Sequence, residues 1–193
     1  MKLAHLAFPL IAALAVLLTG CSPQGSSDQP AAAKPAQPFD AVSAQGKGFP
    51  VGAMMSAHTV YVLFDPQCPH CGHLWEASVP LHNKVKFVWI PVAFINAKSA
   101  PQGAALLSAA NPAELMATHE KSILAGTGGI AASASVAPEL AQAIKNNTAL
   151  FNSLGVESVP YLLAKNIQTG QVVTHNGALP TAALANLLGL PPP

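Results

Sequence analysis

The sequence predicts an α/β domain built in three layers, with a helical insertion near its middle. Two apolar runs, 60–64 and 86–94, are rich in β-branched and aromatic residues, which is typical of buried strands. Segments with helix-start signals or helical spacing follow both runs. The expected order of strand, helix, strand, helices, two strands and a helix favours a sheet covered by helices on both faces.

The first half of the domain contains the strongest strand signals. Val60–Phe64 is continuously apolar, which predicts a buried strand, and a helix should begin at or just after Cys68. Lys86–Phe94 predicts a second buried strand. Because Pro91 has no N–H group to donate, we expect this second strand at a sheet edge or with a bulge.

The insertion, about 100–150, is expected to be mainly helical. One helix is predicted over 101–110 and another from Asn111 onward. Asn111 is a favourable capping residue, Pro112 suits the first helical position, and Glu114 places an acid in the first turn.

Signals in the last third of the chain predict a loop, two helices and a hairpin. Residues 126–136 are rich in Gly, Ala and Ser and predict a loop, whereas apolar spacing predicts a helix over Pro138–Leu154. Pro160–Lys165 and Gln171–Thr174 predict a hairpin around a Gln-Thr-Gly turn. A final helix is expected from about Pro180 to Leu188.

Composition excludes one class of function. Only 9% of the 193 residues are charged, nine lysines oppose eight acidic residues, and arginine is absent. Because there is no basic surface to neutralise phosphates, we do not expect nucleic-acid binding. After the N-terminal segment, no apolar run reaches the roughly 20 residues that a membrane-spanning helix needs.

The N-terminus has the pattern of an exported protein. A weakly positive start precedes an apolar run over Leu6–Leu18, which has the length of a signal peptide's hydrophobic core. The run ends in Leu18-Thr19-Gly20-Cys21, which resembles the lipobox of bacterial lipoproteins. This resemblance implies cleavage before Cys21, lipidation of its sulfur and stable membrane attachment by several acyl chains. The alternative is an ordinary secretory signal that leaves a free thiol.

These signals predict the domain organisation. We expect a lipoprotein signal peptide over 1–20, a lipidated N-terminus and disordered tether over 21–38, and one folded domain over 39–193. The tether is rich in Ser, Pro, Gln and Ala and has no hydrophobic period. Ser22 follows the cysteine in place of an aspartate, which favours the outer membrane in a cell that has one.

Cys68 and Cys71 form a C-x-x-C at the expected start of a helix. Residues at positions i and i+3 share a helix face, so the two sulfurs can meet. At the helix N-terminus, free N–H groups and the helix dipole should lower the pKa of Cys68. Pro69 suits the first helical position. His70 is expected to lower that pKa further as a partly cationic neighbour.

This geometry predicts reversible thiol–disulfide exchange. The Cys68 thiolate attacks a disulfide as the nucleophile, and Cys71, one turn deeper, resolves the mixed disulfide. The reaction requires no metal or organic cofactor.

The dithiol has three other interpretations. Attachment of a c-type haem fails because Gly72, and not a histidine, follows Cys71. A zinc or copper site made of the two cysteines with His70 and His73 would have to wrap four ligands from six residues around one ion. An inert structural disulfide would close so small a loop that it would stabilise the fold very little. A metal carrier or a chaperone-like tethered module is therefore the alternative outside enzymes.

From about Tyr61 to Leu188 the chain resembles the catalytic domain of the DsbC/DsbG family of periplasmic disulfide isomerases and reductases, most closely the DsbG pattern. The resemblance rests on the segments YVLFDPQCPHC, VKFVWIPVAFINAKSAPQGAALL and VPYLLAKN. It implies a thioredoxin-like fold with a helical insertion. It also implies that Pro160 is cis and packs opposite the C-x-x-C, where the backbone of Val159 pairs with a bound peptide.

The chain departs from the family pattern in three places. Too few residues lie between Cys21 and Tyr61 for the family's N-terminal dimerisation domain, so we expect a monomer. The Pro69-His70 dipeptide resembles that of the oxidase DsbA, and so does Val159. A histidine beside Cys68 should favour the reduced form, which predicts a fairly oxidising protein.

The expected partners follow from these two resemblances. Substrates would be exported proteins with cysteines or disulfides. A DsbG-like reductase or isomerase would receive electrons from a DsbD-like membrane partner, and a DsbA-like oxidase would be reoxidised by a DsbB-like one. Trp75 is expected beside the dithiol or in the core. Four histidines have no predicted role: His58, His82, His119 and His175.

Overall fold

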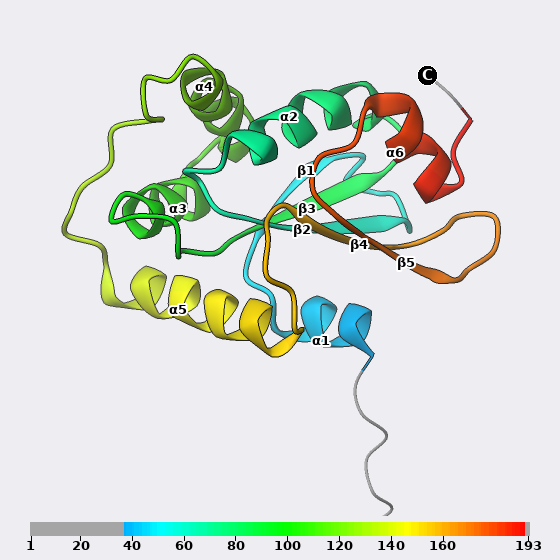
Figure 1. Cartoon of the computed structure of the whole chain (residues 1–193), viewed down its shortest axis with the longest axis horizontal. Coiled ribbons are helices and arrows are strands. Elements are labelled where there is room, and N and C mark those ends of the chain that lie inside the picture. The colour runs from blue at the N-terminus through cyan, green and yellow to red at the C-terminus, as the bar shows by residue number, and fades with distance from the viewer. Residues whose placement is uncertain (1–36, 192–193) are drawn as a thin grey trace, which may run out of the picture. The chain divides into compact units, whose positions relative to one another are not determined.

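A five-stranded mixed sheet lies at the centre of the protein (Figure 1). The computed structural model describes residues 37–191, so the predicted signal peptide, Cys21 and nearly all of the predicted tether lie outside the described residues. The strands are β1 (Phe49–Gly52), β2 (Thr59–Phe64), β3 (Lys86–Pro91), β4 (Tyr161–Lys165) and β5 (Val172–Asn176). Their order is β1-β3-β2-β4-β5; β2 and β3 are parallel, and the other neighbours are antiparallel.

Helices cover both faces of this sheet. They are α1 (Pro38–Gln45), α2 (Pro69–Ser78), the 3-10 turn η1 (Val79–Leu81), α3 (Ser99–Ser108), α4 (Pro112–Leu124), α5 (Pro138–Ser153) and α6 (Thr181–Leu188). Figure 1 shows α2 and α6 on one face and α1 and α5 on the other. The predicted α/β class with three layers is confirmed.

Most of the predicted elements are present. The helix after Cys68 begins at Pro69. The side-chain oxygen of Asn111 caps α4 by accepting a hydrogen bond from the Glu114 N–H, at 3.4 Å. The hairpin of β4 and β5 turns at Gly170, whose φ of 70° suits glycine.

The prediction for the second strand was wrong in two respects. β3 ends at Pro91 and not at Phe94, and it lies between β1 and β2 and not at an edge. Pro91 is tolerated there because it is the last strand residue, and the next N–H, of Val92, donates to Phe64 O at 2.8 Å. The Pro91 carbonyl in turn accepts a hydrogen bond from Asn147.

The sequence did not predict helix α1 and strand β1, because each has a weak pattern. The helix has eight residues and buries only Val42, and the strand has four residues, one of them Pro50. Both are held by tertiary contacts. Tyr61 of β2 packs edge-on against Phe39, with ring centroids 5.4 Å apart, and its hydroxyl donates to Ser43.

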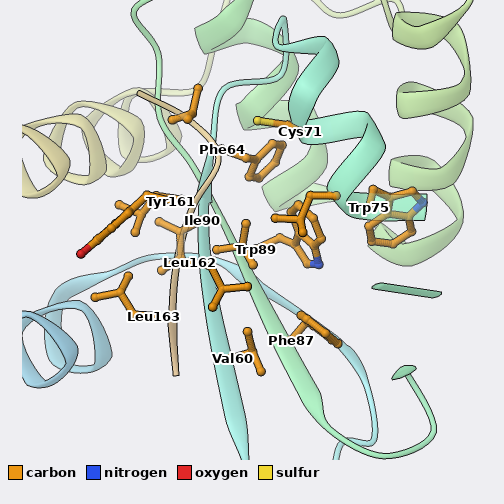
Figure 2. Packing of buried hydrophobic residues seen from close by; sticks show 14 of the residues in the cluster. Val60, Phe64, Cys71, Trp75, Phe87, Trp89, Ile90, Tyr161, Leu162 and Leu163 are labelled. Atoms are coloured by element: carbon orange, nitrogen blue, oxygen red, sulfur yellow. The ribbon is translucent and has the colours of Figure 1, made fainter. Parts of the chain in front are cut away.

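Aromatic side chains fill the core between the sheet and α2 (Figure 2). Phe64 and Trp89 meet edge to face at 5.5 Å, and Trp75 of α2 packs on Trp89 at 5.3 Å. Cys71 belongs to the same buried cluster. The predicted place of Trp75 in the core is confirmed, and its packing on Trp89 fixes α2 against the sheet.

One buried amide joins α5 to the start of β1 and the end of β3. Asn147 is fully buried. Its side chain accepts from Lys47 N at 2.9 Å, and it donates to Lys47 O at 2.7 Å and to Pro91 O at 3.0 Å. Lys47 lies between α1 and β1, and Pro91 is the last residue of β3. One side chain therefore joins three elements of the fold.

We expect Asn147→Ala to lower the free energy of unfolding by about 2–4 kcal/mol, because it leaves buried backbone groups without partners. Urea denaturation measures this. Asn146→Ala is the matched control, since Asn146 is the exposed neighbour on the same helix, and it should change stability by less than about 0.5 kcal/mol. Equal losses in the two variants would contradict this account.

Candidate active site

Asp65 shapes the loop that carries Cys68 out of the sheet. Its carboxylate is fully buried at the end of β2. Oδ1 accepts from the Gln67 N–H at 2.9 Å, and Oδ2 accepts from the N–H groups of Phe94 at 2.8 Å and Ile95 at 3.0 Å. The carboxylate therefore ties the loop after β2 to the loop after β3.

Cys68 occupies the N-cap position of α2. Its N–H donates to Asp65 O at 2.9 Å, and its carbonyl accepts from Cys71 N at 3.0 Å. Pro69 follows at the first helical position, where its missing N–H leaves no intrahelical bond unmade. The N–H groups of His70 and Cys71 in the first turn act on the sulfur of Cys68.

The pKa of Cys68 is lowered from 9.0 to about 7. The largest cause is a hydrogen bond from the Cys71 thiol, and the backbone N–H groups of Cys71 and His70 contribute in the same direction. Burial and the nearby Asp65 carboxylate oppose the shift. At neutral pH about half of the Cys68 population is therefore thiolate, the reactive form.

Cys71 has the opposite character. It is fully buried, while 5% of Cys68 is exposed, and both are free thiols. Burial is the main cause that raises the pKa of Cys71 well above 9.0, and the charges of Cys68 and Glu120 add to it. Cys71 is therefore a protonated donor to its neighbour.

The segment directly before β4 also lies against the dithiol. Cys68 Sγ lies 3.6 Å from Val159 O, and the Val159–Pro160 peptide is cis. Both residues are buried. The structure thus brings together residues that are 91 positions apart in the sequence. Their role in binding a peptide stays a prediction.

His70 and His73 lie on the solvent side of α2, with ring centroids 6.4 Å apart. Among residues 37–191, no three His, Cys, Asp or Glu side chains are placed to share a metal ion. His70 acts on Cys68 through its backbone N–H. An effect of its imidazole on the pKa of Cys68 stays a prediction.

His119, for which the sequence predicted no role, lies on α4 of the insertion and supports the active-site loop, residues 65–68. It is fully buried on α4. Its Nε2 lies 2.7 Å from Pro66 O, and its Nδ1 accepts from Ile130 N at 3.2 Å. These partners require the neutral ring with the proton on Nε2, in agreement with a pKa lowered by burial.

A second contact between the insertion and the loop is made by amide side chains. Gln67 Nε2 donates to Gln102 Oε1 at 2.5 Å and to Gly128 O at 3.1 Å. Gln102 in turn donates to Gly128 O and Ile130 O, each at 2.9 Å. The residue directly before Cys68 is therefore held by α3 and by the loop after α4.

Among residues 37–191, Glu120 and Asp65 are the buried carboxyl groups. Only 1% of Glu120 is exposed, and among the described residues neither of its oxygens has a hydrogen-bond partner. It packs against α2 at Gly72, where a Cβ would lie 3.0 Å from Glu120 Oε2. The pKa of Glu120 is raised to about 9, mainly by burial and further by the charges of Cys68 and Glu76.

The fold and the dithiol define a thioredoxin-like protein with a C-x-x-C at a helix N-terminus. The crystal structure of a periplasmic thioredoxin-like protein from Salmonella enterica serovar Typhimurium matches with a TM-score of 0.61 and 17% identity, over 79% of this chain and 94% of that one. The thioredoxin-like fold that the sequence predicted is confirmed. No protein-family model matches the chain.

Two sequence relatives carry the name thiol:disulfide interchange protein DsbG. The one from Pseudomonas aeruginosa is 29% identical over 140 residues, covering 72% of this chain and 54% of the relative. The one from Escherichia coli is 30% identical over 118 residues, covering 59% of this chain and 47% of the relative. The predicted resemblance to DsbG is confirmed, and the chain spans about half the length of these curated relatives.

We expect Glu120→Gln to stabilise the reduced protein at neutral pH. Glu120 ionises near pH 4.5 in the unfolded chain but only near pH 9 in the folded one. Between those values folding takes up a proton, so stability falls by about 1.4 kcal/mol per pH unit as pH rises. Glutamine cannot ionise, so at pH 7 the variant should be more stable by about 3 kcal/mol, and at pH 4 the two proteins should be equal.

Urea denaturation at several pH values, under reducing conditions, measures the difference. Glu114→Gln on the same helix is the control, because Glu114 is exposed and its loss should not add a pH-dependent difference. A stability gap between Glu120→Gln and the wild type that is the same at pH 4 and pH 7 would show that Glu120 is not held neutral.

Proposed function

We propose that this protein is a periplasmic thiol–disulfide oxidoreductase that exchanges disulfides with exported proteins, acting as a DsbG-like reductase or isomerase. Cys68 is the nucleophile and Cys71 the resolving thiol. The observation that carries the proposal is the asymmetric pair: one sulfur with a pKa of about 7 at a helix N-terminus, and one buried and protonated beside it. The similarity to DsbG proteins supports the same activity.

The pKa of Cys68 supports the reductase or isomerase direction. The nucleophilic cysteine has a pKa of about 7 in thioredoxin and about 3.5 in the oxidase DsbA. A lower pKa stabilises the reduced form and makes a stronger oxidant. With a pKa of about 7, Cys68 is closer to thioredoxin than the Pro69-His70 dipeptide predicts. That dipeptide remains the feature that supports the oxidase alternative.

Exposed apolar surface beside the loop suits an unfolded protein substrate. Phe94 and Ile95 are 47% and 42% exposed, and their backbone N–H groups bind the same Asp65 carboxylate that orders the loop before Cys68. Apolar side chains flanking a cysteine in a substrate would find contacts there. In this proposal the backbone of Val159, against Cys68, pairs with the same peptide.

We also propose that the protein is anchored by lipid on Cys21, with the outer membrane favoured, and that a DsbD-like membrane protein supplies its electrons. In residues 37–191 no helix is long and apolar enough to cross a membrane. The lipobox-like Leu18-Thr19-Gly20-Cys21 supports the anchor. Metabolic labelling with a fatty acid should mark the wild type and not Cys21→Ser; a labelled variant would contradict the anchor.

The exchange activity is tested with insulin. The protein should accelerate the reduction of insulin by dithiothreitol, and Cys68→Ala should abolish this effect. Cys71→Ala should retain the attack but accumulate a mixed disulfide on Cys68, seen by mass spectrometry and removed by reductant. Ser43→Ala, a substitution of similar size in an exposed part of α1, should behave as wild type. Full activity in Cys68→Ala would refute the proposal.

The direction of exchange is tested in cells by acid quenching and alkylation of free thiols. A mostly reduced pair indicates a dedicated electron supply and a reductase or isomerase. A mostly oxidised pair would instead favour the DsbA-like oxidase.

A further inference from the structure

A cavity lies beside the active-site loop, between the start of α3 and the loop that follows α4. Its volume is about 460 Å³, which is within the range of sites that bind small ligands or side chains. The walls come from the segments 97–102 and 127–134 and are mainly small or apolar. Lys98 is the one charged residue among those that line the cavity. A largely apolar cavity with a single cation suits a ligand that carries a carboxylate.

Hydrogen bonds connect this cavity to the nucleophilic cysteine. Gly128 O, in the cavity wall, accepts from Gln67 Nε2 at 3.1 Å and from Gln102 Nε2 at 2.9 Å. Gln67 directly precedes Cys68. The ammonium group of Lys98 lies against the same glycine, since a Cβ on Gly128 would be 3.2 Å from Lys98 Nζ. The cation is therefore close to the loop that carries the reactive sulfur.

One short segment of chain, 94–98, joins the exposed apolar surface to the cavity. It begins with the exposed side chains of Phe94 and Ile95. The Asn96 side chain then donates to Gln67 Oε1 at 3.1 Å and accepts from the Lys98 N–H at 2.8 Å. A peptide that reacts at the dithiol and lies over the two apolar side chains would reach the cavity a few residues from its own cysteine.

We propose that this cavity is a specificity subsite in which Lys98 binds an acidic side chain near the cysteine of a protein substrate. This inference rests on the proposed thiol–disulfide exchange and names a substrate class for it, exported proteins with an aspartate or glutamate a few residues from the reacting sulfur. Lys98 immediately precedes α3, whose N-terminal end adds partial positive charge on the same side of the cavity.

Lys98 acts on the substrate and not on the dithiol. The pKa of Cys68 is lowered by groups of Cys71 and His70. Replacing Lys98, which is exposed, should therefore leave the reactivity of Cys68 itself unchanged. An ion pair at an exposed lysine is weak, so we expect a preference of about three- to fivefold for an acidic peptide.

The test uses short peptides that contain one cysteine activated as its 2-pyridyl disulfide. The Cys68 thiolate attacks the peptide sulfur, a Cys68–peptide disulfide forms, the bond to the pyridine sulfur breaks, and pyridine-2-thiolate leaves and is followed by absorbance. A single aspartate is placed in turn at the positions before and after the cysteine, and each aspartate peptide is matched by an asparagine peptide. Each rate is divided by the rate of the same peptide with dithiothreitol, which removes the intrinsic effect of the aspartate.

At one or two neighbouring positions the aspartate peptide should react about three- to fivefold faster than its asparagine match, and this preference should disappear at about 1 M salt. Lys98→Gln should abolish the preference and leave the asparagine peptide within about twofold of its wild-type rate. Lys98→Glu should reverse it, so that a lysine peptide is favoured at the same position.

Lys145→Glu is the matched control, because it makes the same change in net charge at an exposed position of α5 outside the cavity wall. It should keep the wild-type preference. The absence of an aspartate preference at every position in the wild type, or an equal loss in Lys98→Glu and Lys145→Glu, would overturn the subsite.

The two proposals fail in different ways. If the protein is not an exchange catalyst, no peptide reacts faster with the wild type than with Cys68→Ala. If the cavity is not a substrate subsite, all peptides react, and the ratio of aspartate to asparagine rates is the same in the wild type and in Lys98→Gln.

Discussion

The position of the Cys68 sulfur at the N-terminus of α2 is the constraint on which the chemistry of this protein depends. β2 ends at a buried carboxylate, Asp65, which binds the N–H groups of three residues in two loops and so fixes where the helix begins. The sulfur of Cys68 then interacts with the N–H groups of His70 and Cys71 in the first turn, and the packing of Trp75 against Trp89 holds the helix there. The chemistry of the dithiol follows from this backbone geometry and from the depth at which Cys71 lies.

The same site holds three acidic groups whose pKa values differ widely. Cys68 loses its proton near neutral pH because a thiol and two N–H groups stabilise its anion, whereas Cys71 and Glu120 keep theirs because burial disfavours charge. Such a separation of pKa values between neighbours is typical of sites where protons move during reaction. The helical insertion contributes directly to this arrangement, since it supplies Glu120 and also holds the active-site loop through His119 and Gln102.

Local signals were sufficient for the fold class and for the dithiol. Continuous apolar runs marked β2 and β3, and the C-x-x-C with its proline marked the start of α2. The prediction from Pro91 was wrong because this proline is the last residue of a central strand. The hydrogen bond to the neighbouring strand is made by the next N–H group, that of Val92. His119 and Glu120 could not be found, because their importance comes from α4 packing against α2, a contact between segments about fifty residues apart that no local pattern encodes.

Cys68 is a moderately stabilised thiolate, held by the Cys71 thiol and the helix N-terminus. The direct measurement is the rate of Cys68 alkylation as a function of pH, in wild type and in Cys71→Ala. We expect a half-maximal rate near pH 7 in the wild type and a clear upward shift of this midpoint in the variant, where the largest stabilising partner is gone. A wild-type midpoint near the ordinary value of 9.0, or one that Cys71→Ala leaves unchanged, would contradict it.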